Sequence, residues 1–485
     1  VAAAIGREVS YRILRAATPR DEWVLRQDLM ELVDARLLLA RRGAGEEAYV
    51  FRHALMRDAA YESMVRATRQ GVHRAIAEGV RGQIRPLADL QPEWLAHHLE
   101  EAGDLPAAAE HWFRGGDRAF RRAAYTEATH CFERSLAVLA RLPETPERVA
   151  QEVETLTMLG TVHLYTTGHS HPRGREAFAR AQMLCEAHSI DLSLKILSHL
   201  SGAYIIQGNR EAMNVLRPRF ERLLESPDPV AQLTAVSSLG LDAFWRGEHA
   251  RAHAVFERGL PLYESEIFRH FAEEYGWDGG IFVPLYAIWN RAVLGFPASA
   301  DAPLLDAAAH SFDAQAPALI ETFSMVAAHV RRDVANARAH AERAIAICAE
   351  QRFLGLMLVG MCGRGLALAL EGRHDEGISE LQNGTAMLEA GGASSLHAYY
   401  GTYLAEALVL AGRVEQGFAA IAAGLAHCSG SLARVHEPEL LRLEGELHRR
   451  AGDAVTAADR FHRALTLARE RGAVAWEQRI VESLA

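Results

Sequence analysis

The lysine content of this chain decides whether it can bind a nucleotide through a phosphate loop. Such a loop needs glycines followed by Lys and then Ser or Thr, because the ammonium group neutralises the β- and γ-phosphates. The 485 residues include a single lysine, Lys195, which lies in SLKILSH without a preceding glycine loop. We therefore expect no ATPase site within this chain.

The histidines are the next residues whose spacing could support chemistry. His97 and His98 are adjacent in LAHHLEEAG, and His169 and His171 are close together in TTGHSHPRG. Zinc needs three or four ligands in a closed set, and no carboxylate or thiol completes either pair locally. The five cysteines are scattered and never form CxxC, which argues against a disulfide framework or a zinc knuckle. We expect exposed or helix-capping histidines, and no catalytic residue, metal or cofactor in this chain.

Composition limits the classes of protein to which the chain can belong. Hydrophobic residues make up 49% of it and aromatic residues only 7%, which suits closely packed helices. The net charge of −10 argues against a surface for polyanions along the whole chain. No apolar run approaches the length of a membrane span, and the first residues lack a signal-peptide pattern, so we expect a cytoplasmic protein. Because the sequence starts at Val1 within a helical pattern, we also expect an N-terminal truncation.

Residues 1–84 read as a small mixed module. Tyr11–Ala17 and Trp23–Leu38 have helical apolar spacing, and LLLAR and AYVFRH flank a glycine-containing turn as a β-hairpin would. Two helices followed by a hairpin are typical of a winged-helix module. The segment from Asp21 to Asp34, at the position of a recognition helix, carries five acids against Arg26 alone. Phosphates would repel such a helix, so we expect contact with protein and none with nucleic acid.

The stretch Tyr49–Tyr61 joins this module to the rest of the chain. Its first residues suit a half-buried strand, whereas Leu55, Met56, Ala59 and Ala60 share a helical face. The sequence predicts a strand that turns into a helix here.

From about residue 85 to residue 485 the sequence repeats with a period near 40 residues. A turn position is followed at fixed offsets by small and aromatic residues, as Ala457 and Phe461 follow Gly452. The turn position is filled in order by Gly168, Gly208, Gly247, Arg332, Gly372, Gly412 and Gly452. Small residues let paired helices approach closely, and stacked pairs make one continuous core. We predict an all-α chain: a tetratricopeptide-like (TPR-like) α-solenoid superhelix behind the winged-helix module.

The period is broken once, by an irregular insertion at about residues 265–300. It concentrates four aromatic residues, Trp277, Phe282, Tyr286 and Trp289, around Gly279-Gly280. One interpretation is a loop that enters the groove of the superhelix and contacts a ligand or partner. The other is that these aromatics pack a lengthened junction between repeats. Both remain open from the sequence.

Several segments resemble one group of bacterial proteins, the STAND-type signalling NTPases fused to TPR arrays. The resemblance rests on IGREVSYRIL at residues 5–14, on YVFRHALMRDAAYESM at 49–64, on the segment 95–128 and on the last repeat. Members often follow an adenylate or guanylate cyclase or a kinase domain. The resemblance implies an upstream nucleotide-binding domain that holds ATP or ADP with magnesium, and a protein or small effector in the TPR groove.

The resemblance also implies a role for His53. In STAND proteins a Met-His-Asp-type motif at the end of the winged-helix module senses the bound diphosphate, and FRHALMRDAAY is similar to it. His53 takes the place of the sensing histidine and Arg52 is a further candidate, although Ala54 replaces the aspartate. The alternative is that His53 caps the strand–helix junction structurally.

The preferred interpretation is therefore a regulatory, non-enzymatic part of a signal-transduction ATPase or cyclase. One alternative is the sensor array of a LuxR/MalT-like transcriptional regulator, whose DNA-binding domain would lie elsewhere. The other is a stand-alone TPR scaffold.

Overall fold

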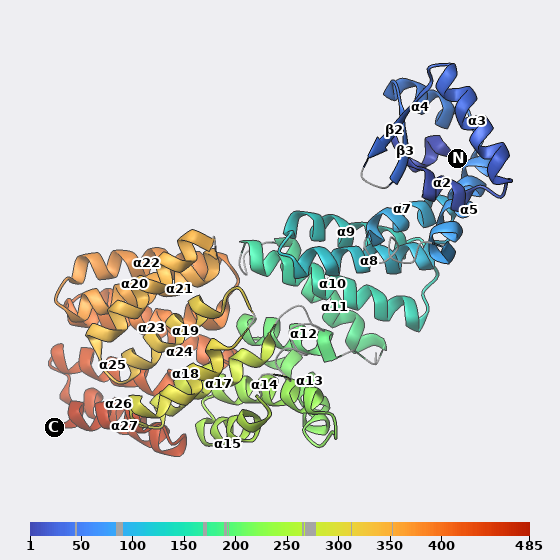
Figure 1. The fold of residues 1–485 in the computed structure, drawn as a ribbon. Helices are drawn as coiled ribbons and strands as arrows, with labels where there is room; N and C mark the ends of the chain where they lie inside the picture. Colours follow the sequence, from blue (N-terminus) through green and yellow to red (C-terminus); the bar gives the residue numbers. More distant parts are fainter. Residues whose placement is uncertain are drawn as a thin grey trace. The chain divides into compact units, whose positions relative to one another are not determined.

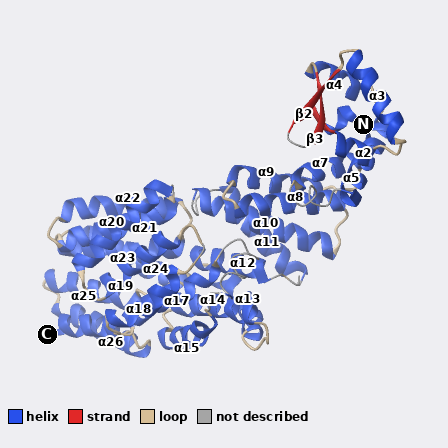
Figure 2. Ribbon diagram, viewed as in Figure 1, coloured by secondary structure: helices blue, strands red, loops and turns tan. Residues whose placement is uncertain are grey.

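The computed structural model describes residues 1–43, 46–83, 91–167, 172–188, 192, 194–263, 266, 278–311, 313–351 and 353–485. The contacts divide the chain into two compact units. Unit 1 comprises Val1–Leu159 and Leu184–Ile190, and unit 2 comprises Gly160–Met183 and Asp191–Ala485. The strands of the described residues belong to the N-terminal part of unit 1, and helices make up most of the rest (Figures 1 and 2).

Unit 1 begins with a mixed α/β module and continues as helix pairs. Its elements are α1 (Ala2–Ile5), β1 (Glu8–Ser10), α2 (Tyr11–Ala17), α3 (Glu22–Asp34), β2 (Leu38–Gly43), β3 (Glu46–Phe51), α4 (Ala54–Glu62), α5 (Arg66–Gln83), α7 (Pro92–Ala102), α8 (Leu105–Arg121), α9 (Tyr125–Leu139) and most of α10 (Pro146–Thr167). The expected hairpin is present as β2 and β3, in antiparallel register from Leu38↔Phe51 to Gly43↔Glu46. β1 pairs with the other edge of β3, so the sheet has a third strand that the sequence reading missed.

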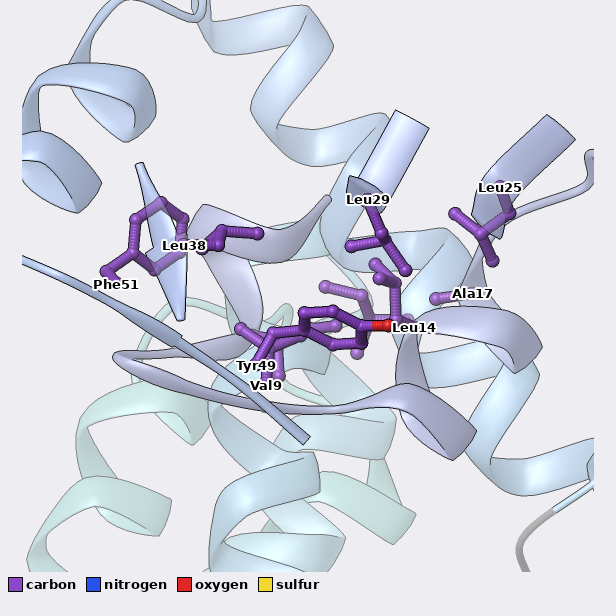
Figure 3. Packing of buried hydrophobic residues seen from close by; sticks show 10 residues of the cluster. Val9, Leu14, Ala17, Leu25, Leu29, Leu38, Tyr49 and Phe51 are labelled. Atoms are coloured by element: carbon purple, nitrogen blue, oxygen red, sulfur yellow. The ribbon is translucent and has the colours of Figure 1, made fainter. Parts of the chain in front are cut away.

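The core of this module forms where α2 and α3 pack against the sheet. Its members come from α2 and α3, from the sheet, from α1, which supplies Ile5, and from α5, which supplies Ile76. Figure 3 shows Leu14 and Ala17 of α2, Leu25 and Leu29 of α3, and the strand residues Val9, Leu38, Tyr49 and Phe51 turned toward one another. α3 ends earlier than predicted because Arg36 adopts a left-handed conformation, with φ of 59°, before β2 begins.

Helix α5 connects this core with the first helix pairs. Ile76 belongs to the core of the mixed module, whereas the adjacent Ala77 packs with α7, α8 and α9. α5 approaches α2 closely at Gly79, where an added Cβ would lie 2.3 Å from the Ala16 carbonyl oxygen. The two cores of unit 1 thus share one helix.

Unit 2 is a stack of helix pairs. Its elements are the end of α10, most of α11 (Pro172–His188), α12 (Leu194–Gln207), α13 (Arg210–Leu223), α14 (Pro229–Trp245), α15 (His249–Gly259), η2 (Leu260–Leu262), η3 (Gly279–Ile281), α17 (Phe282–Val293), η4 (Ala298–Asp301), α18 (Ala302–Ala309), α19 (Ala316–Val330), α20 (Val334–Gln351), α21 (Leu354–Leu370), α22 (His374–Ala390), α23 (Ser394–Leu410), α24 (Val414–Gly430), α25 (Glu437–Arg450), α26 (Ala454–Glu470) and α27 (Val474–Leu484). α12, α14, α17, α19, α21, α23, α25 and α27 each pack on the next of this series.

The predicted turn positions lie at the turns within the helix pairs. Gly208, Gly247, Gly372, Gly412 and Gly452 have φ between 70° and 89°, and Arg332, where the register predicted a turn without glycine, has φ of 63°. Gly168 lies outside the described residues. The left-handed conformations at these turn positions confirm the predicted period. The succession of helix pairs confirms the predicted all-α solenoid architecture.

A glycine–phenylalanine contact recurs inside the pairs. The ring of Phe461 in α26 lies on the backbone of Gly445 in α25, so an added Cβ would be 2.6 Å from a ring carbon. The same contact joins Gly240 to Phe256 and Gly116 to Phe132, each time 16 residues apart. The small residue of the first helix therefore sets how deeply the aromatic ring of the second helix can pack.

Unit 2 also closes on itself. α12 packs against α23, and the Ser395 hydroxyl donates to the Ile205 carbonyl oxygen at 2.6 Å. The Leu432 amide donates to the Gly208 carbonyl at 3.2 Å. Farther along, the Arg479 guanidinium of α27 donates to the carbonyl oxygens of His329 and Val330, at 2.9 and 2.7 Å. Helices whose bonded residues are 150 and 190 positions apart are thereby in direct contact.

Candidate functional site

An aromatic cluster forms where the closed array brings α14, α17, α19 and α23 together. Trp289 lies 4.6 Å from Phe244 and 4.8 Å from Tyr399 between ring centroids, and Tyr286 lies 4.9 Å from Phe323. The Trp245 indole donates to the Tyr286 hydroxyl at 3.1 Å. Edge-on geometry and burial make such a cluster a rigid wall.

Beside this wall lies a cavity of about 250 Å³. It exceeds the roughly 150 Å³ of an apolar cavity that binds benzene, and it approaches the small end of natural ligand pockets. Its walls come from eight helices, α10, α12, α14, α17, α19, α21, α22 and α23, and from the residues next to them. The lining includes Ser198, Ser201 and Ile205 of α12, Ser238 and Leu241 of α14, Tyr286 and Trp289 of α17, Thr322 and Phe323 of α19, Gly355 and Leu358 of α21, Met387 of α22 and Tyr400 of α23.

The cavity has a buried end and a more exposed end. Tyr286, Trp289 and Tyr400 are at most 6% exposed, whereas Leu354 at the start of α21 is 38% exposed and Met387 is 47% exposed. Both exposed side chains are apolar. The more exposed side of the cavity is thus lined by apolar side chains at the start of α21 and near the end of α22.

Three of the four aromatic residues singled out in the sequence line this cavity. Phe282, Tyr286 and Trp289 belong to α17, and Trp277 lies outside the described residues. The prediction of a loop is wrong for residues 282–293, because the apolar run after Gly279-Gly280 forms a helix whose inner face packs on α14 and α19. These side chains pack a junction between repeats, as the second interpretation has it, and they also line the cavity; their contact with a ligand or partner stays a prediction.

The opening end of the cavity was not foreseen, because α21 and α22 lie more than 60 residues beyond α17 in the sequence. The sequence contained one indication of this end of the cavity. Gly355 and Met387 occupy helix positions at which an ordinary amphipathic pattern would place polar residues. The indication alone does not say that the two face one space.

The other predicted site lies at the start of α4. His53 is the N-cap residue of α4, is exposed, and makes no side-chain capping bond, so the capping interpretation is wrong for its imidazole. Arg52 is exposed beside it. Leu55 is 80% exposed and Met56 38% exposed, so the apolar face predicted for this helix is open to solvent. Whether His53 senses a nucleotide stays a prediction.

A histidine cluster in unit 1 corrects a further expectation. His98 is 1% exposed, and its Nδ1 lies 2.8 Å from Nδ1 of His73, whose Nε2 lies 2.9 Å from the Tyr61 hydroxyl. Burial lowers the pKa of His73 to about 4 and the pKa of His98 to about 3. His98 was expected to be exposed or capping, yet it shares a helical face with Leu95 and Leu99, a spacing that indicates burial. The chain of bonds links the end of α4 to α7.

The described residues contain no group of three or more His, Cys, Asp or Glu side chains placed to hold a metal ion. His169 and His171 lie outside them. Among the described helices, none is long and apolar enough to cross a membrane.

Comparisons with known proteins place the fold. No family model matches the chain. An uncharacterized protein of Rhizobium meliloti (strain 1021) is 24% identical over 504 residues, a match that includes 100% of this chain and 48% of the relative. The chain thus spans about half the length of the curated relative that it matches.

Of two solved structures among those that match this chain, the first has a TM-score above 0.5. A Rap protein complexed with Competence and Sporulation Factor has a TM-score of 0.53 at 11% identity, over 79% of this chain and 99% of that chain. A STAND protein with a tetratricopeptide repeat sensor from Pyrococcus horikoshii has a TM-score of 0.38 at 9% identity, over 99% of this chain and 64% of that chain. The chain has an all-α, TPR-like superhelical fold.

Proposed function

We propose that this chain is the regulatory portion of a signal-transduction protein, in which the TPR-like array binds an effector and the N-terminal module couples that event to an upstream nucleotide-binding domain. The observation that carries the proposal is the cavity in unit 2. Its walls come from repeats that the closure of the array brings together, so a bound molecule would stabilise one arrangement of those repeats over another.

The N-terminal module supports the coupling role. Its element order of helix, strand, two helices and two strands fits a winged-helix module of residues 1–84, with the TPR-like array over 85–485. The single basic residue of α3, Arg26, forms ion pairs with Glu22 at 3.2 Å and with Glu47 at 3.0 Å. A helix whose one arginine is already paired offers little to a phosphate backbone, which favours a protein partner.

The exposed edge at Arg52, His53, Leu55 and Met56 is the surface we assign to the upstream domain. This edge combines two hydrogen-bond donors, the Arg52 guanidinium and the His53 imidazole, with an exposed apolar face. A nucleotide-binding domain that carries ATP or ADP with magnesium would offer phosphate oxygens to these donors. The length of the Rhizobium relative leaves room for such a domain. ATPase or cyclase activity would belong to that domain, in the cytoplasm.

The test uses the full-length protein, expressed with the coding sequence upstream of Val1. We expect His53→Ala to accelerate release of a fluorescent ADP analogue about tenfold or more, because a hydrogen bond to a charged phosphate oxygen is lost. His462→Ala, which removes an exposed histidine at the other end of the chain, is the matched control. Equal release rates for the wild type and His53→Ala would refute the sensing role.

A further inference from the structure

The described residues that line the cavity in unit 2 include no Asp, Glu, Lys or Arg, and His199 is the one histidine among them. An ionised ligand group moved from water into such a site loses its hydration without gaining a counter-charge, a cost of several kcal/mol. The lining therefore selects against ligands that carry a full charge.

Two serine hydroxyls meet at one corner of the cavity. The Ser201 hydroxyl donates its hydrogen to the Ser198 carbonyl oxygen at 2.9 Å, and it also lies 2.8 Å from the Ser238 hydroxyl. A serine hydroxyl has one hydrogen. When the Ser201 hydrogen is on the Ser198 carbonyl oxygen, Ser238 is the donor within the pair, and the oxygen of Ser238 keeps acceptor capacity only.

Two further hydroxyl groups in the lining also donate their hydrogens to backbone carbonyl oxygens. Ser237 donates to the Gly279 carbonyl oxygen at 3.1 Å, and Thr322 donates to the Ala318 carbonyl oxygen at 2.7 Å. All of these oxygens can still accept a hydrogen bond. A ligand atom that meets them gains a bond only if it is an O–H or N–H donor.

Size and wall chemistry limit the rest of the ligand. If about 150 Å³ holds benzene, then about 250 Å³ holds roughly ten non-hydrogen atoms. Apart from Gln315, His199 and the hydroxyl-bearing residues, the walls are aromatic and aliphatic, with Trp289 and Phe323 in the buried part. Flat apolar groups fit such walls by edge-on contact.

We infer that the effector of this site is an uncharged, largely apolar small molecule with at least one hydroxyl or N–H group that donates to the oxygen of Ser238. The regulatory role of this site rests on the proposed function. The binding of such a molecule in the cavity does not depend on it. The inference excludes carboxylates, phosphates and charged peptide termini from the cavity.

The experiment measures binding of three related probes to the 485-residue chain by calorimetry. 2-Naphthol is neutral and has a donor, naphthalene lacks the donor, and 2-naphthoate carries a negative charge. We expect saturable one-to-one binding of 2-naphthol, at least fivefold weaker binding of naphthalene, and at least tenfold weaker binding of 2-naphthoate. Ser238→Ala should remove the preference for 2-naphthol over naphthalene.

Variants that fill the cavity test its location. Gly202 in α12 and Gly355 in α21 both line it, and an added Cβ at either would meet no atom within 4 Å. Gly202→Leu and Gly355→Leu should therefore fold and abolish 2-naphthol binding. Gly401→Leu is the matched control, since Gly401 is also helical with open space around it but does not line the cavity. Far-UV circular dichroism confirms that all three variants are folded.

The outcomes separate this inference from the proposed function. Binding of 2-naphthoate as tight as that of 2-naphthol, or unchanged binding in Gly202→Leu and Gly355→Leu, overturns the ligand class while leaving coupling to nucleotide release intact. Selective 2-naphthol binding without any effect on ADP release from the full-length protein overturns the coupling and leaves the ligand class. Absence of binding by all three probes overturns the inference.

Discussion

The recurring glycine–phenylalanine contact predicts opposite effects for one substitution at two helical glycines. An alanine Cβ at Gly445 would lie 2.6 Å from a ring carbon of Phe461, about 1 Å inside ordinary carbon–carbon contact. Overpacking of this kind costs about 1–3 kcal/mol, whereas replacing glycine within a helix gains about 1 kcal/mol. We expect Gly445→Ala to lower the free energy of unfolding by up to about 2 kcal/mol.

Gly401 supplies the control. An added Cβ there meets no atom within 4 Å, so Gly401→Ala should gain the helix propensity without the clash and raise stability by about 0.5–1 kcal/mol. The assay is urea unfolding, together with hydrogen exchange of the α25 and α26 amides, because a repeat array need not unfold in two states. Phe461→Leu should reverse the sign of Gly445→Ala by removing the ring. Equal stabilisation by Gly445→Ala and Gly401→Ala would refute the reasoning.

The remaining predictions concern buried polar groups. Burial keeps His73 and His98 neutral by lowering their pKa values, so between about pH 6.5 and 4 the unfolded chain binds more protons than the folded chain. As the pH is lowered through that window, the free energy of unfolding of unit 1 should therefore decrease by about 1.4 kcal/mol per pH unit for each histidine. Urea midpoints at pH 7 and pH 5 measure this, and an equally steep slope in a His73→Leu/His98→Leu variant would contradict it. Arg479→Ala should cost about 3–5 kcal/mol, since two buried carbonyl bonds and the contact with Glu439 are lost. The exposed pair of Arg469 with Glu477 provides its control: Arg469→Ala should change stability by less than about 1 kcal/mol, and similar losses in both variants would argue against the role of Arg479.

What could be predicted from the sequence is what depends on neighbouring positions. The 40-residue register placed Arg332 at a turn although it is not glycine, and the structure gives it a left-handed conformation. The strand–helix junction at Tyr49–Tyr61 followed from the change of periodicity within one stretch. In each case the physical cause lies within a helix pair or between two adjacent elements.

The rest depends on the curvature of the array, which no local pattern encodes. Trp289 was recognised as unusual, but its contact with Tyr399 joins positions 110 residues apart in a closed stack. The serine corner of the cavity was missed for the same reason, because Ser201 and Ser238 read as ordinary polar residues in separate helices. His98 could have been placed correctly, since its spacing from Leu95 and Leu99 was visible in the sequence.

The contact of α12 with α23 sets a condition on how this chain can change its length. In an open solenoid each repeat touches only its neighbours, so evolution can add or delete one and extend or shorten the rod. Here the hydrogen bond from Ser395 to Ile205 and the bond from Leu432 to Gly208 span the repeats between them. Insertion or loss of a single helix pair between them would separate Ser395 from Ile205 and Leu432 from Gly208. The number of repeats in this part of the chain is therefore fixed by the closing contacts. Evolution can alter this part by replacing side chains that face the interior, but not by duplicating repeats.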